Sequence, residues 1–242
     1  MKKIFLSITL FIFVKTSLAQ DTYSPNVAFK WAPTGLILGD ISLQAEYSFS
    51  DKHSLTAKIG IPVTAHHTFQ YEDKDAVFNM KATSFLAGYR TYLSRKKHML
   101  GLYFEPYFKY VHHASEGTGL GTLNGQTVMM NFTNDYNGVG IGAQLGAQFI
   151  IGKRFIIDLF FLGPEINSAR NNFKSVEVTN TIPWNSIQAQ EAERDIRDFI
   201  NKFPFVKNNT TVKVDQQNRI VTADFNGALP GYRIGVSFGV AL

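Results

Sequence analysis

Apolar and polar residues alternate one by one over several stretches of this chain, most clearly at residues 136–151 and 232–242. Because successive side chains of a β-strand point to opposite faces, this alternation predicts strands with one apolar face. The other face of both stretches carries small or polar residues, which suits a crowded interior. In the last stretch the apolar set is Tyr232, Ile234, Val236, Phe238, Val240 and Leu242.

Eight stretches carry a strand signal, and the connections between them differ in length. Those near residues 51, 95 and 153 are short, whereas those at 64–79, 115–134 and 167–229 are long. Short periplasmic turns and long external loops are typical of transmembrane barrels. We therefore predict that residues 20–242 form an all-β fold, a transmembrane antiparallel up-and-down β-barrel of eight strands. The predicted strands are residues 27–38, 41–50, 54–62, 81–93, 99–112, 136–151, 155–162 and 232–242.

Seven charged residues lie within these strands on the face opposite the apolar set. A basic side chain facing lipid near the middle of the bilayer costs about 2–4 kcal/mol, so the apolar faces should point outward and the charges inward. Four cations and three anions nearly cancel, as a buried charge network requires. We predict a structural charge network in the lumen made by Glu46, Lys58, Arg90, Glu105, Lys109, Asp158 and Arg233.

The short turns also predict which charged residues face one another across neighbouring strands. A three-residue turn at 51–53 sets Glu46 opposite Lys58, and a turn at 152–154 sets Gln148 opposite Asp158. A wider turn near residue 95 sets Arg90 opposite Tyr103 and diagonal to Glu105.

The longest connection, residues 167–229, is a domain-sized insertion with its own pattern. Apolar residues at helical spacing predict a helix over about 187–203, which Pro204 ends, and a hairpin around residues 215–218 follows. The insertion is expected to lie outside the cell, where it recognises a partner of unknown identity or packs as a lid on the barrel rim. A third possibility adds the hairpin to the wall and gives ten strands.

The first nineteen residues have the pattern of a signal peptide. Lys2 and Lys3 precede an apolar run at residues 4–14, and Ser17-Leu18-Ala19, with small residues at the usual cleavage positions 17 and 19, predicts cleavage before Gln20. Removal of three lysines lowers the net charge from +5 to about +2, which argues against a nucleic-acid partner. The chain has no cysteine, so disulfide and thiolate chemistry are absent.

An exported barrel is expected in the outer membrane of a Gram-negative bacterium. Its expected partners are outer-membrane lipids, including lipopolysaccharide, and the barrel-assembly machinery, which would bind the last strand.

Four segments carry a resemblance to a known group of proteins. They are Leu86-Ala87-Gly88-Tyr89-Arg90-Thr91-Tyr92-Leu93, residues 101–107, residues 158–164 and the ending 230–242. With them the chain resembles small OmpA/OmpX-like outer-membrane barrels of bacteroidete-type bacteria, including a family of unknown function. The resemblance implies the barrel fold and the outer-membrane address and transfers no catalytic residue. Leu242 departs from the aromatic residue that commonly ends such proteins.

Candidate chemistry is sparse. His113 and Ser115 are similar to the catalytic pair of outer-membrane lipid A deacylases, which also need a carboxylate to orient the histidine. Glu116 is adjacent only in sequence. His53, His66 and His67 lack the spacing of a metal site, and no cofactor is expected. We therefore predict a non-enzymatic barrel with an anchoring or loop-mediated binding role; a small pore and a deacylase-like hydrolase are the alternatives.

Overall fold

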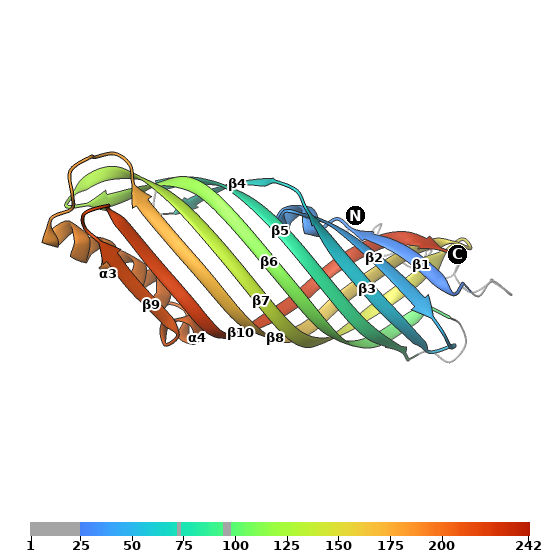
Figure 1. The fold of residues 1–242 in the computed structure, drawn as a ribbon. Helices are drawn as coiled ribbons and strands as arrows, with labels where there is room; N and C mark the ends of the chain where they lie inside the picture. The colour runs from blue at the N-terminus through green and yellow to red at the C-terminus, as the bar shows by residue number, and fades with distance from the viewer. Residues whose placement is uncertain (1–24, 72–73, 94–97) are drawn as a thin grey trace, which may run out of the picture.

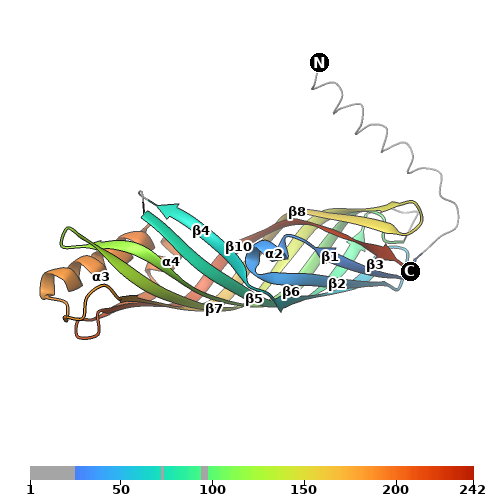
Figure 2. The same cartoon turned by 90° about the horizontal axis from the view of Figure 1, so that it is seen from above.

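The structure, a computed structural model, describes residues 25–71, 74–93 and 98–242; the predicted signal peptide lies outside them. One antiparallel sheet closes on itself because β1 pairs with both β2 and β10 (Figures 1 and 2). The ring has eight strands, as predicted. They are β1 (Val27–Ala32), β2 (Asp40–Ser48), β3 (His53–Pro62), β5 (Lys74–Tyr92), β6 (Gly101–Leu123), β7 (Gln126–Ile151), β8 (Phe155–Glu177) and β10 (Ile220–Ala241).

Two further strands lie outside this ring. Strand β4 (Ala65–Tyr71) pairs with β5, and β9 (Thr210–Asp215) pairs with β10. The hairpin predicted around residues 215–218 is therefore present, but it does not enter the ring, and the ten-stranded alternative is wrong.

The first strand was predicted at 27–38, which is too long. In the structure β1 ends at Ala32, and one helical turn, α2 (Gly35–Leu38), leads into β2. Gly39 ends that turn in the left-handed conformation, with φ at 82°, and its N–H donates to the carbonyl oxygens of Gly35 and Leu36. A left-handed residue at this position is usually glycine because it has no Cβ.

Two of the three connections predicted as long loops are largely strand, and the third is strand at both of its ends. Residues 64–79 belong mainly to a β4–β5 hairpin, and β6 and β7 meet at the two-residue turn Asn124-Gly125. Both turn residues have positive φ, 50° and 73°, as tight hairpin turns require. The insertion predicted at 167–229 narrows to 178–219, because β8 runs to Glu177 and β10 begins at Ile220.

These long strands rise beyond the ring as an open, curved sheet (Figure 1). We call this part the extension; it consists of β4, β9 and the distal ends of β5, β6, β7, β8 and β10 (residues 74–82, 112–137, 168–177 and 220–228).

Helices α3 (Ser186–Asn201) and α4 (Pro204–Lys207) contact the extension. Helix α3, predicted at 187–203, begins with a capping box in which the side chain of Asn185 accepts from the backbone N–H groups of Ile187 and Gln188. Within residues 25–71, 74–93 and 98–242, no helix is long and apolar enough to cross a membrane. Helix α3 packs on the concave face of the extension. The core between them consists of Leu123, Val128, Trp184, Ala189, Ala192, Ile200, Val212, Val221 and Ala223.

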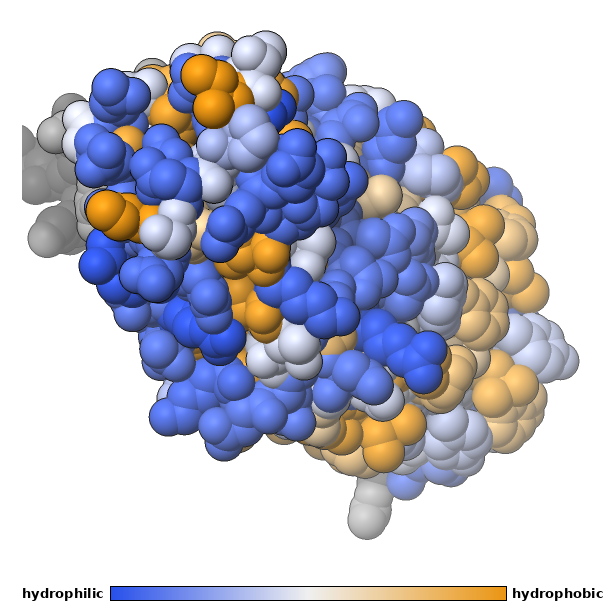
Figure 3. Space-filling model, turned by 60° about the vertical axis from the view of Figure 1, so that its left-hand side comes forward, coloured by the Kyte–Doolittle hydropathy of each residue, from blue (hydrophilic) through white to orange (hydrophobic). Residues whose placement is uncertain are grey.

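The outer surface changes polarity where the ring becomes the extension. Along β6 the outward side chains are apolar or aromatic from Leu102 to Tyr110 and polar at His112 and Glu116. Strand β7 changes at the same level, since its outward Val139 pairs with Tyr110 and its outward Asn137 pairs with His112. Figure 3 looks toward the extension, which is mostly hydrophilic, while hydrophobic side chains gather on the ring at the right.

Candidate functional site: a charged lumen

Two buried cations organise the part of the lumen nearest the short turns. The ammonium of Lys30 contacts Glu46 Oε2 at 2.6 Å, Asp158 Oδ2 at 2.7 Å and Gln148 Oε1 at 2.6 Å. The guanidinium of Arg90 contacts Glu105 Oε2 at 2.7 Å, Asp158 Oδ2 at 2.9 Å and Glu46 Oε2 at 3.3 Å. We call these residues, with the tyrosines and glutamines described next, the lower network.

Neutral side chains complete the lower network. Tyr92 donates to Glu46 Oε1 at 2.6 Å, Tyr103 donates to Asp158 Oδ1 at 2.7 Å, and Gln144 donates to Glu105 Oε2 at 2.9 Å. Arg90 also lies 3.6 Å from the centre of the Tyr103 ring. Because every charge has several partners, the network offsets the desolvation of five ionised groups and fills this end of the lumen.

The sequence provides room for these side chains at glycines on the facing strand. A Cβ at Gly146 of β7 would overlap the ring of Tyr103, and one at Gly142 would overlap Tyr107. Two of the small residues that alternate along β7, Gly142 and Gly146, are therefore the places over which lumen tyrosines of β6 lie.

The structure brings together four of the seven predicted lumen charges in the lower network: Glu46, Arg90, Glu105 and Asp158. Lys58, Lys109 and Arg233 also face the lumen but lie nearer the extension. Lys30 was missed, although it shares its face with Ala28 and Ala32 while Phe29 and Trp31 point outward. That alternation was a usable signal, but it covers only a few positions.

Two of the three predicted pairings are wrong by two residues. Glu46 pairs with Thr56, and Lys58 pairs with Gln44, because the β2–β3 turn begins at Ser50 instead of Asp51. Tyr103 pairs with Tyr92, which sets Arg90 level with Glu105. Gln148 pairs with Asp158 as predicted. A slip of two residues preserves the face of every side chain, so the lumen charges were found even where their partners were not.

Strand β8 switches its inward face at an irregularity near Gly163-Pro164. The register between β7 and β8 shifts after Leu145, and that between β8 and β10 shifts after Arg233. Asp158 and Glu165, on opposite parities, consequently both point inward.

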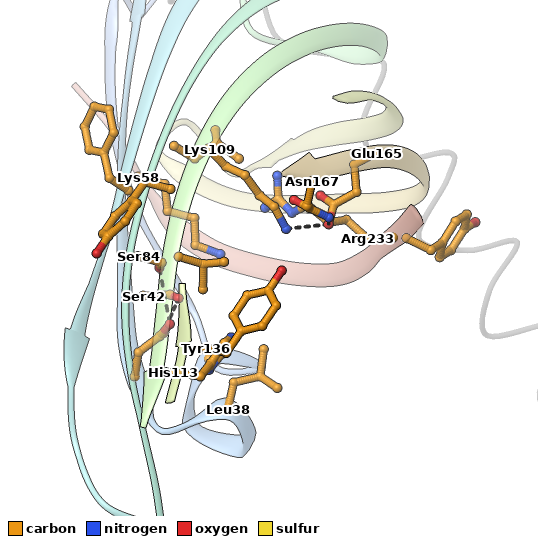
Figure 4. A pocket seen from close by; sticks show the side chains of 18 of the residues that line it. Leu38, Ser42, Lys58, Ser84, Lys109, His113, Tyr136, Glu165, Asn167 and Arg233 are labelled. Atoms are coloured by element: carbon orange, nitrogen blue, oxygen red, sulfur yellow. Dashed lines mark hydrogen bonds and ion pairs between the residues drawn. The ribbon is translucent and has the colours of Figure 1, made fainter. Parts of the chain in front are cut away.

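Above the lower network the lumen widens into a cavity of about 630 Å³, which we call the vestibule (Figure 4). Lys109 forms an ion pair with Glu165, and Tyr107 donates to the second oxygen of that carboxylate at 3.0 Å. Asp40 accepts from Ser42 at 2.5 Å and from Ser84 at 3.3 Å. Both vestibule carboxylates are therefore already engaged.

Two vestibule cations lack such partners. The guanidinium of Arg233 lies 4.9 Å from the ring centre of Tyr107 and 5.2 Å from that of Phe160. Its buried NH1 group has no hydrogen-bond partner in the described part of the chain. The ammonium of Lys58 lies 5.9 Å from the same Phe160 ring, and none of the described carboxylates lies within ion-pair distance of either cation.

His113 and Ser115 do not form a catalytic arrangement. Both lie on the inward parity of β6, and the His113 ring lies 5.9 Å from that of Tyr136, tilted by 48°. Its Nδ1 has no hydrogen-bond partner among the described residues, Ser115 included. Glu116 points to the outer face and is exposed, so it cannot orient the histidine. Nor does the described chain contain a group of three or more His, Asp or Glu side chains that could hold a metal ion.

The fold and the lumen define a class: a closed eight-stranded antiparallel β-barrel whose interior is filled by charged and aromatic side chains at one end. No family model matches the sequence, and no curated protein matches it. A solved structure titled "Crystal Structure of Acinetobacter baumannii CarO" is similar at 9% identity and a TM-score of 0.47, covering 92% of this chain and 100% of that chain.

Proposed function

We propose that this chain is an integral outer-membrane β-barrel protein that has no enzymatic activity and anchors a binding platform outside the cell. The platform is the extension together with α3 and α4. The change of outer-surface polarity between Tyr110 and His112 supports this proposal most directly, because it separates a band suited to hydrocarbon from a sheet suited to water.

The height of the apolar band fits a membrane. It covers residues 102–110 on β6 and 139–151 on β7. At about 3.3 Å per residue and a tilt of about 40°, these stretches rise roughly 20–30 Å, near the apolar height of about 25 Å of outer-membrane barrels. The short turns would then face the periplasm and the extension the outside, with lipopolysaccharide around the upper rim. The resemblance to bacteroidete-type barrels agrees with this orientation.

The lower network favours a closed barrel over a pore. An eight-stranded barrel has an interior that side chains can fill, and here Arg90 and Tyr103 are nearly inaccessible to solvent. We expect the purified protein to show no stable ionic conductance in a planar lipid bilayer, although it changes gel mobility on boiling as folded barrels do. Reproducible conductance steps from the heat-modifiable form would contradict the closed barrel and favour the pore, for which the vestibule would be the wide mouth.

The hydrolase alternative makes a separate prediction. Because none of the described residues activates Ser115, Ser115→Ala is expected to leave the lipid A acyl pattern of the expressing cell the same as with the wild-type protein. Mass spectrometry of lipid A from cells with wild type, S115A and empty vector measures this. If lipid A from cells with the wild-type protein lacks an acyl chain that is present with S115A and with empty vector, the protein is a deacylase.

A further inference from the structure

The vestibule contains more cations than its own carboxylates pair with. Lys58, Lys109 and Arg233 face Asp40 and Glu165 across it. Lys109 is held by Glu165, and the carboxylate of Asp40 is occupied by two serine hydroxyls. Lys58 and Arg233 therefore remain as two cations beside one aromatic ring, that of Phe160, and they repel each other there.

The surroundings of Arg233 fix its guanidinium and leave one edge free. Contacts with the rings of Tyr107 and Phe160 hold it in place through cation–π attraction. The free NH1 group is a buried donor, and such donors are normally satisfied. A planar guanidinium presents paired N–H groups that match the oxygens of carboxylate or phosphate.

A nearby acceptor narrows the ligand class. Asn167 lines the same cavity, and its buried Oδ1 has no partner in the described structure, while its amide nitrogen donates to Glu165 Oε1 at 3.3 Å. A carboxylate could accept from Arg233 and Lys58, but it has no donor for the Oδ1 atom of Asn167. A monoprotonated phosphate offers anionic oxygens to Arg233 and Lys58 and an O–H group to Asn167.

We propose that the vestibule is a binding site for phosphate, free or as a small phosphate monoester, with Arg233 and Lys58 as its cationic ligands. A cavity of about 630 Å³ lies within the range of small-molecule sites, about 300–1,000 Å³, and exceeds what inorganic phosphate alone requires. The opening toward the extension passes His113 and Tyr136, whose ring and hydroxyl groups would meet the organic part of a monoester. This inference depends on the barrel fold and is independent of the anchoring role.

Isothermal titration calorimetry of the full mature chain in nonionic detergent tests the site, with inorganic phosphate, methyl phosphate and acetate at constant ionic strength. Saturable binding of one phosphate is expected, with acetate weaker. Arg233→Gln should weaken phosphate binding at least about tenfold, because it removes a buried hydrogen bond between two charged groups. Lys58→Gln should weaken it less, and Arg233→Lys should restore part of the affinity.

Lys81→Gln is the matched control, because Lys81 is an exposed cation on the outer face of β5. The change in gel mobility on boiling shows whether each variant is folded; if R233Q does not fold, K58Q compared with K81Q decides. Absence of saturable binding to the folded wild type would overturn the site. Equal weakening by K81Q and K58Q would likewise overturn it, because the phosphate would then be an adventitious ion at surface cations. Either result would leave the anchoring proposal standing.

Discussion

Arg90→Met is expected to lower the free energy of unfolding by about 3–5 kcal/mol, because it removes the central cation from a buried network and leaves Glu105 without its ion-pair partner. Arg90 is 1% exposed and contacts Glu46, Glu105 and Asp158. Only Lys30 would remain to balance three acids. Equilibrium unfolding in urea, followed by the fluorescence of the two tryptophans, Trp31 on the barrel wall and Trp184 in the core between α3 and the extension, measures the change.

Arg170→Met provides the comparison for Arg90. Arg170 lies on the outward face of β8 in the extension and is exposed, so its replacement should change stability by no more than about 0.5 kcal/mol. If R90M and R170M unfold at the same urea concentration, the lower network does not stabilise the barrel. Adding Glu105→Gln to R90M should recover part of the loss, because one unpaired charge is then neutral.

The ring and its lumen were predictable because a membrane barrel imposes one rule on every strand. Outward residues such as Phe108 and Ile141 are apolar, and inward residues such as Glu105 and Gln144 are polar or small. Parity alone then assigns a face to each charge. Parity cannot decide between registers that differ by two residues, and for that reason Glu46 was given Lys58 as a partner when Thr56 lies opposite.

The extension could not be predicted by the same rule, because its polarity is reversed. Its inward face packs on α3 through residues such as Val128 and Val221, whereas its outward face is polar. Over residues 115–134 the inward positions of β6 include Gly117, Gly119 and Gly121, so no apolar stripe marks the strand. The dipeptide Asn124-Gly125 was the available signal, since it favours a two-residue hairpin turn.

The bounds of helix α3 could be predicted from the local sequence, but its packing partner could not. Its spacing of apolar residues and its end at Pro204 are local, so its bounds were predicted within two residues. Its packing partner is not local, because the concave face exists only once strands β6, β7, β9 and β10 lie side by side. Trp184, which donates to Glu177 Oε2 at 2.7 Å, joins the helix start to the end of β8 and was not recognised.

Leu159→Arg is expected to destabilise the folded barrel by about 2–4 kcal/mol in lipid, because Leu159 points outward near the middle of the proposed membrane band. It is 39% exposed and pairs with Ala147 on β7 and Val236 on β10, which also face outward. Urea unfolding in liposomes measures the loss. The same substitution should cost much less in detergent micelles, where the headgroups lie closer to the barrel wall.

Asn172→Arg gives the decisive comparison, since residue 172 is on the same strand and also points outward, but on the extension side of the polarity change. Its neighbours Asp135 and Asp224 are acidic, so an arginine there remains hydrated beside opposite charge and should cost less than about 0.5 kcal/mol. Similar small effects at both positions would mean that the apolar band does not contact lipid. A large effect at Leu159 alone would place the membrane boundary on β8 between them, at the level where His112 and Asn137 begin the polar surface of neighbouring strands.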